Sequence, residues 1–133
     1  MRPERLLEIE WKHLDVAGET CDRCAGTIST IQQVLEELRQ EGQLNRVRVR
    51  VRETPLPQAR IAESNQVLIN GTLIEEILSA VVAETYCPSC SSLTGESSCC
   101  RAVEHEGIVY EELPAPLIRR AILTVLGKEA EAA

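Results

Sequence analysis

A pair of cysteines marks the point in this chain where one backbone pattern changes into another. An extended apolar run from Leu6 to Val16 ends shortly before Cys21-Asp22-Arg23-Cys24, and a helical pattern then runs from Ala25 to Leu38. At the start of a helix, unpaired backbone N–H groups and the positive end of the dipole favour a thiolate, so a thiol there has a lowered pKa. Two sulfurs three positions apart can also close a disulfide or bind a soft metal ion.

The residues around this motif predict a strand, a helix and a second strand. The first strand is expected at about 6–14 and the helix at about 25–41, and a clean alternation of arginine with valine follows at 45–52. One face of this helix carries a largely apolar stripe of Cys24, Ile28, Ile31, Leu35 and Leu38. This spacing predicts that Cys24 faces inward and that Cys21 lies at the exposed cap of the helix. Gly42 is a suitable helix stop. Together these segments form a βαβ unit with parallel strands.

The second half of the chain predicts further strands and helices. Pro55 and Pro57 are expected to end the second strand, and Asn70-Gly71 between apolar runs predicts a tight hairpin. A helix is expected from Ile74 to about Ala83. A βαβ unit followed by ββα outlines an α/β thioredoxin-like fold. We therefore expect one domain over 1–133, with a Cys-rich loop at about 84–100 and a hairpin and helix at about 101–127, the helix starting near Pro114 and stopping at Gly127.

Several of these segments together resemble an uncharacterised prokaryotic family. The resemblance rests on Glu10–Leu14, Glu19–Cys24, Val67–Gly71, the late cysteines and Tyr110–Ile122, and it covers nearly the whole chain. That family is a domain of unknown function grouped with thioredoxin-like folds. The resemblance implies a fold but no established activity.

The chain departs from redox-active thioredoxin-like proteins at one position. Such proteins usually carry a cis-proline before the strand that faces the CxxC, and here that position falls at Asn65 or Gln66. A cis bond before a residue other than proline is costly, so a trans bond is expected. His13 could approach the motif from the preceding strand, but packing or solvation is the more common role of a strand histidine.

The first cysteine pair supports two interpretations. In one, Cys21 attacks a disulfide or another electrophile, and Cys24 resolves the mixed disulfide. In the other, the pair binds a thiophilic metal or metalloid, because Thr20–Cys24 is similar to the motif of copper and heavy-metal chaperones, although Glu19 stands where those proteins usually carry methionine. A purely structural pair is the third alternative.

The late cysteines form a second candidate site. Cys87, Cys90, Cys99 and Cys100, or three of them with His105, have spacing compatible with a tetrahedral zinc site. Cys87-Pro88-Ser89-Cys90 is also similar to glutaredoxin and disulfide-isomerase motifs, so a redox relay with the first pair is an alternative. A structural disulfide or unreacted thiols are the remaining interpretations, and spacing leaves the connectivity open.

Composition narrows the classes of partner. A net charge of −7 and the near absence of aromatic residues argue against nucleic acid and anionic membranes. Neither a signal peptide nor a membrane span is predicted, so we expect a soluble cytoplasmic protein. The arginine row at 46, 48, 50 and 52 is expected to protect a sheet edge or to bind an anion. The pairs Glu36-Glu37, Glu75-Glu76 and Glu111-Glu112 are expected to be solvated or locally ion-paired.

The sequence therefore predicts a thiol-disulfide oxidoreductase or thiol-transfer protein that uses Cys21 and Cys24. Its partner would be a protein disulfide or a small-molecule thiol. The alternative is a protein that binds or delivers zinc or another thiophilic metal through the CxxC and the late cysteines. A third hypothesis is a degenerate thioredoxin-like scaffold for protein interactions.

Overall fold

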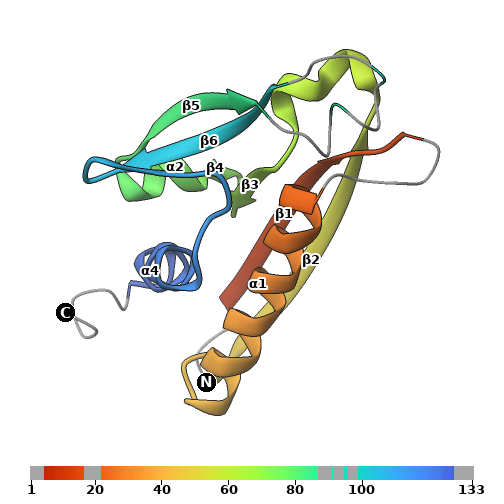
Figure 1. The fold of residues 1–133 in the computed structure, drawn as a ribbon. Helices are drawn as coiled ribbons and strands as arrows, with labels where there is room; N and C mark the ends of the chain where they lie inside the picture. The colour runs from red at the N-terminus through yellow and green to blue at the C-terminus, as the bar shows by residue number, and fades with distance from the viewer. Residues whose placement is uncertain (1–4, 17–21, 87–90, 92–94, 96–98, 128–133) are drawn as a thin grey trace.

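The protein is a mixed α/β structure in which two β-sheets share one apolar core. The computed structural model describes residues 5–16, 22–86, 91, 95 and 99–127. In chain order the elements are β1 (Arg5–Leu14), α1 (Asp22–Gln40), β2 (Val47–Leu56), the 3-10 helix η1 (Gln58–Glu63), β3 (Gln66–Ile69), β4 (Thr72–Leu73), α2 (Ile74–Leu78), β5 (Val81–Tyr86), β6 (Cys99–His105), β7 (Ile108–Tyr110) and α4 (Ala115–Val125). Figure 1 shows this arrangement.

Strand β1 is at the centre of the larger sheet, whose strand order is β2-β1-β3-β4. It pairs in parallel with β2, from Arg5 opposite Val47 to Leu14 opposite Leu56. On its other side it pairs antiparallel with β3, where Trp11 lies opposite Val67. The smaller sheet has the order β5-β6-β7, with antiparallel pairing throughout. The predicted βαβ unit with parallel strands is therefore present.

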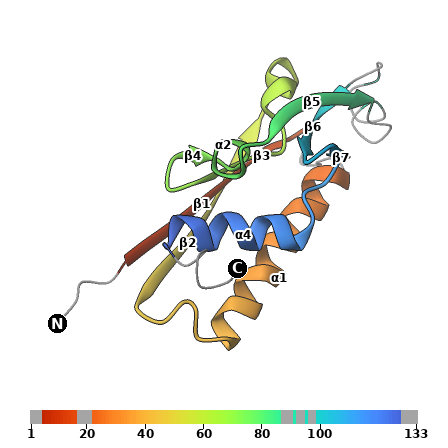
Figure 2. The same cartoon turned by 90° about the vertical axis from the view of Figure 1, so that its left-hand side faces the viewer.

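The core lies between one face of the larger sheet and the helices. Alternate residues of β1 supply its centre, because Leu7 and Ile9 have no exposed surface and Trp11 is 3% exposed. Helices α1 and α4 pack against each other on this side, as Figure 2 shows. The helix residues of the core are Ile31, Val34, Leu35, Leu38, Leu117, Ile118, Ala121 and Ile122. Val103 of the smaller sheet joins the same cluster, so both sheets are held by one core.

The opposite face of β1 and β2 is polar and carries a ladder of ion pairs. Parallel register places Arg50 beside Glu8 and Arg52 beside Glu10, and the closest N–O distances are 3.5 Å and 3.1 Å. Strand β2 is an edge strand of its sheet, as the arginine row predicts. Two of the four arginines thus neutralise carboxylates of the neighbouring strand, and exposed pairs of this kind stabilise a fold only weakly.

Several predicted turns occur where the residue types indicated. Asn70 and Gly71, which connect β3 and β4, both have positive φ, at 50° and 83°, the combination that a tight hairpin of this type needs. Gly42 follows α1 with a φ of 78°, and Gly127 follows α4 with a φ of 74°. Pro114 caps the start of α4. The hairpin around Glu106-Gly107 joins β6 to β7.

The prediction of a helix from Ile74 to Ala83 is wrong in its second half. Helix α2 ends at Leu78, and Ser79 adopts a left-handed conformation with a φ of 56°. The Ala80 N–H then donates to the Glu75 carbonyl, which closes the helix end. Val81 and Val82 begin strand β5, because pairing with β6 satisfies their backbone groups and β-branched residues suit a strand.

Strand β2 ends between its two prolines, as predicted. Pro55 lies within the strand, opposite His13 of β1. A proline lacks the backbone N–H, but on an edge strand this loss can fall on the side without a neighbouring strand. The strand ends at Leu56, which is buried at 1% exposure.

Thr54→Val is expected to reduce stability in a pH-dependent way. The Thr54 hydroxyl donates to Glu10 Oε2 at 2.6 Å, and this bond, followed by the Arg52 guanidinium, holds the pKa of Glu10 below its ordinary value. A lowered carboxyl pKa stabilises the folded state above the unfolded-state pKa, and this contribution is lost as pH falls. We expect a loss of about 1 kcal/mol near neutral pH.

Urea unfolding at neutral and at acidic pH would measure this difference. The difference in the free energy of unfolding between wild type and Thr54→Val should become smaller in acid, because Glu10 is protonated there in both proteins. Thr72→Val, an exposed threonine of β4, is the control for the effect of valine in a strand. A gap of the same size at both pH values would contradict the role assigned to Thr54.

Candidate functional site

The cysteine motif coincides with the start of α1. The helix begins at Asp22, and Cys24 is its third residue. Cys21 lies outside the described residues, and for Cys24 the structure describes only the backbone. The first turn of a helix has backbone N–H groups without intrahelical acceptors and a partial positive charge. The position of the motif at this end of α1 therefore matches the prediction made from the change of pattern.

The late cysteines divide between described and undescribed parts of the chain. Cys87 and Cys90 lie outside the described residues. Cys99 and Cys100 begin β6, where their backbones pair with Tyr86 and Thr85, so the prediction that puts them in a loop is wrong. Register explains the difference, because the β5–β6 pairing continues up to these positions.

His105 cannot share a metal ion with Cys99 or Cys100. It ends the strand that Cys99 and Cys100 begin, and the five residue-to-residue steps from Cys100 to His105 separate their Cα atoms by roughly 16 Å. Zinc ligands lie about 2 Å from the ion, so these two residues are too far apart to share one. Within the described part of the chain, no three His, Cys, Asp or Glu residues are grouped to hold a metal ion. The four-cysteine zinc site stays a prediction.

A carboxylate lies against the first turns of α1. Glu112 belongs to the connection between β7 and α4, and its side chain occupies the space beside Gly26. A Cβ atom on Gly26 would come within 2.9 Å of Glu112 Cδ and would also clash with Oε1. Gly26 is the fifth residue of α1, so a negative charge lies beside the first turns of this helix.

Asn65, one of the two residues predicted for the position of the usual cis-proline, is bonded to β1. Asn65 has a φ of 63°, its N–H donates to the Lys12 carbonyl at 2.6 Å, and its Oδ1 accepts a hydrogen bond from Trp11 Nε1 at 3.3 Å. All peptide bonds that the structure describes are trans, as expected. His13 stacks on Trp11 with 4.3 Å between ring centroids, so this histidine is packed against a neighbour of its own strand.

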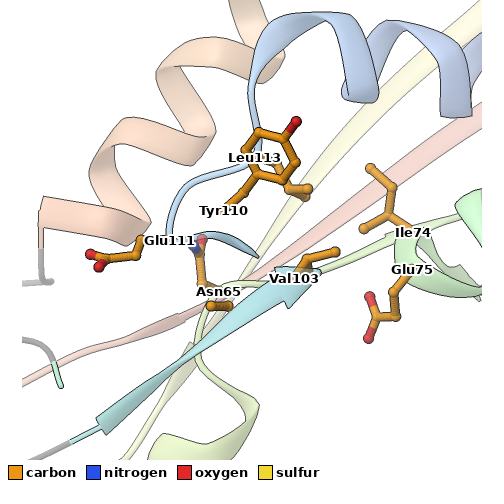
Figure 3. A pocket seen from close by; sticks show the side chains of 8 residues that line it. Asn65, Ile74, Glu75, Val103, Tyr110, Glu111 and Leu113 are labelled. Carbon is orange, nitrogen blue, oxygen red and sulfur yellow. The ribbon is translucent and has the colours of Figure 1, made fainter. Parts of the chain in front are cut away.

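Figure 3 shows the small pocket beside Asn65. It is lined by Asn65, Ile74, Glu75, Ala102, Val103, Tyr110, Glu111 and Leu113. Its volume of about 10 Å³ is enough for about one water molecule. A pocket of this size does not hold an organic substrate.

Sequence reasoning missed both Glu112 and the role of Asn65. The pair Glu111-Glu112 is exposed, as predicted, but only the tertiary structure places Glu112 beside Gly26 of α1. A signal was nevertheless present, because Gly26 stands inside a helical pattern that would be stronger with alanine. A glycine of this kind often marks a close approach by another group.

Comparison with known proteins identifies the family of this chain. Residues 7–122 match the family described as Domain of unknown function (DUF2703). The chain belongs to this family. It is similar to an uncharacterized protein of Archaeoglobus fulgidus, with 34% identity over 120 residues, which cover 84% of this chain and 82% of the relative. No solved structure matches the chain. Within the described residues, no helix is both long and apolar enough to cross a membrane.

Substitutions of Asn65 should separate its backbone role from its side-chain role. Asn65→Gly keeps access to positive φ but loses the acceptor for Trp11 Nε1, whereas Asn65→Ala loses both. We expect Asn65→Ala to lower the free energy of unfolding by about 1 kcal/mol more than Asn65→Gly does.

Urea titration followed by the fluorescence of Trp11, the only tryptophan of the chain, would measure both variants. Equal destabilisation would mean that the left-handed backbone at position 65 is not under strain in the alanine variant.

Proposed function

We propose that this protein is a thiol-disulfide oxidoreductase or thiol-transfer protein in which Cys21 is the nucleophile and Cys24 the resolving thiol. The observation that carries the proposal is the start of α1 at Asp22, immediately after Cys21 in sequence. A thiol at that position gains from the positive end of the helix, which favours the reactive thiolate.

The order of the elements supports a thioredoxin-like fold as part of this proposal. The chain runs β1-α1-β2, followed after η1 by β3-β4-α2, and the strand order is β2-β1-β3-β4. The first two strands are parallel, and the motif follows the carboxyl end of β1. Ligand and reaction sites of α/β sheets are commonly found outside the carboxyl ends of parallel strands.

The proposed reaction is a two-step exchange in which the dithiol supplies two electrons. The Cys21 thiolate attacks one sulfur of a substrate disulfide, the substrate S–S bond breaks, and the departing thiolate takes up a proton. The Cys24 thiolate then attacks the Cys21 sulfur, which releases the second substrate thiol and leaves a Cys21–Cys24 disulfide. A small-molecule thiol would return the protein to its reduced form by the reverse exchange.

The proposed substrates are disulfides presented at a protein surface or carried by small-molecule thiols, and the proposed compartment is the cytoplasm. In a reducing compartment, cysteines close in sequence serve mainly in catalysis, redox sensing or metal binding.

Reduction of insulin by dithiothreitol, with the protein as catalyst, tests the proposal. Cys21→Ser should abolish catalysis because the attacking thiol is lost. Cys24→Ser should stop after the first step and accumulate a mixed disulfide at Cys21, which mass spectrometry detects. Cys90→Ser makes the same chemical change in the late cysteine cluster and should keep the activity.

Native mass spectrometry of anaerobically purified protein provides an independent measurement. A metal-free protein that loses two hydrogens on mild oxidation, mapped to Cys21 and Cys24, is the expected result. A stoichiometric metal adduct that protects both thiols from alkylation would contradict the redox proposal.

A further inference from the structure

Strand β2 has a neighbour on only one of its sides among the strands that the structure describes. It runs for ten residues, from Val47 to Leu56, and Figure 1 shows it in yellow at the margin of the larger sheet. The outer edge of such a strand presents backbone N–H and C=O groups with which another strand can pair. Pro55 has no N–H to donate, so residues 47–54 form the part of β2 that is suited to a further strand.

Arginines on the polar face of β2 reach further into solvent than the carboxylates with which they pair. The side chains of Arg50 and Arg52 are 62% and 56% exposed, whereas those of Glu8 and Glu10 are 26% and 18% exposed. Register places Leu6 of β1 opposite Arg48. A guanidinium has five N–H donors, and even a bidentate pair with one carboxylate uses two of them. Arg50 and Arg52 therefore keep donors for a second carboxylate.

The other face of β2 is apolar along the same residues. Val47 and Val49 are half-buried against the margin of the core, and Val51 is 38% exposed. Because side chains alternate between the two faces of a strand, these valines alternate with the arginines. A strand placed beside β2 would cover the valines with every second side chain. The outer edge of β2 is thus apolar on one face and cationic on the other.

Strand β1 shows which side-chain pattern pairs with β2. Its buried residues alternate with Glu8 and Glu10, whose carboxylates lie 3.5 Å from Arg50 Nη1 and 3.1 Å from Arg52 Nη2. Every second residue of a strand is spaced by roughly 6.6 Å, so carboxylates and guanidiniums match pair by pair along two neighbouring strands. A second strand with the same alternation would match the arginine row from the outer side.

We propose that the outer edge of β2 is a docking site for an extended acidic segment of a partner protein, in which Asp or Glu alternates with apolar residues. The segment pairs with β2 as an additional strand, a mode in which backbone hydrogen bonds supply affinity and alternate side chains supply specificity. Its carboxylates face the arginine row, and its apolar side chains continue the valine face.

Charge argues against other occupants of this edge. A second copy of β2, paired antiparallel in one continuous sheet, would place arginines of both copies on the same face, and like charges on neighbouring strands destabilise the pairing. A nucleic acid would be repelled by the net charge of −7 and would leave the valine face uncovered. The arginines thus disfavour neutral and basic strands and select an acidic one.

Binding of a synthetic peptide to the full-length protein tests the proposal. The probe is a blocked, fluorescently labelled peptide of seven residues that alternates valine with glutamate, and fluorescence anisotropy measures its dissociation constant. One control peptide has the same composition with its glutamates contiguous, and another carries lysine in place of glutamate. We expect the alternating acidic peptide to bind, and both controls to bind about tenfold more weakly or less.

Two N-methylated forms of the acidic peptide separate strand pairing from charge attraction. Methylation of every second backbone nitrogen blocks one edge of a strand and leaves the charge unchanged. Because only one edge of the peptide faces β2, methylation of one set of residues should abolish binding, and methylation of the other set should preserve it. Equal affinity of the two forms would contradict strand pairing.

Variants of the arginine row test the polar face. Arg50→Gln combined with Arg52→Gln should weaken binding by about three- to twentyfold, because each exposed ion pair contributes little. Arg39→Gln combined with Arg120→Gln removes two exposed arginines from α1 and α4 and should leave the affinity unchanged. Urea unfolding checks that both double variants are folded, and the methylated peptides test the wild type without any substitution.

Several results would overturn the inference. No binding of the alternating peptide, or equal binding of the peptide with contiguous glutamates, would remove the acidic strand as the occupant. Equal weakening by the control variant would indicate net charge in place of position. A single-stranded oligonucleotide of the same charge that binds as tightly would assign the row to polyanions. A wild-type dimer that Arg50→Gln with Arg52→Gln strengthens would assign the edge to a second copy of the chain.

Discussion

The hydrogen bonding of β1 on both sides is the constraint on which the rest of this structure depends. A strand with neighbours on both edges has its backbone N–H and C=O groups satisfied within the sheet, which allows it to lie in the core. Parallel pairing with β2 requires a crossover between the two strands, and α1 forms that crossover. The core residues of β1 then determine which face the helices cover, so the start of α1 necessarily follows the carboxyl end of β1.

The polar face of the same strand has a different role. The carboxylates of Glu8 and Glu10 are held by arginines of β2 and, for Glu10, by the Thr54 hydroxyl as well. These contacts involve Arg50 and Arg52, two of the four arginines of the row at the sheet edge, and charged side chains on an edge strand disfavour pairing with another chain. The candidate site follows the carboxyl end of this strand in sequence. Near that end, Trp11 stacks on His13 and donates a hydrogen bond to Asn65.

Sequence analysis correctly predicted the features that a few neighbouring residues determine. Asn70-Gly71 had to turn because both residues tolerate positive φ, and α1 and α4 ended close to Gly42 and Gly127 for the same reason. It failed where the cause was distant in the chain. Ile74 to Ala83 has helical spacing, but pairing with β6 drew Val81 and Val82 into a strand, and similar pairing extended β6 back to Cys99.

The sequence by itself determined the βαβ unit, the place of the CxxC motif at the start of a helix and the turns with glycine or asparagine. These features follow from side-chain periodicity and backbone preferences, which act over a few residues. Only the tertiary structure decided that Glu112 lies against Gly26, that Asn65 is bonded to β1, and that His105 is remote from Cys99 and Cys100. Each of these depends on contacts between residues far apart in the chain, which local patterns do not specify.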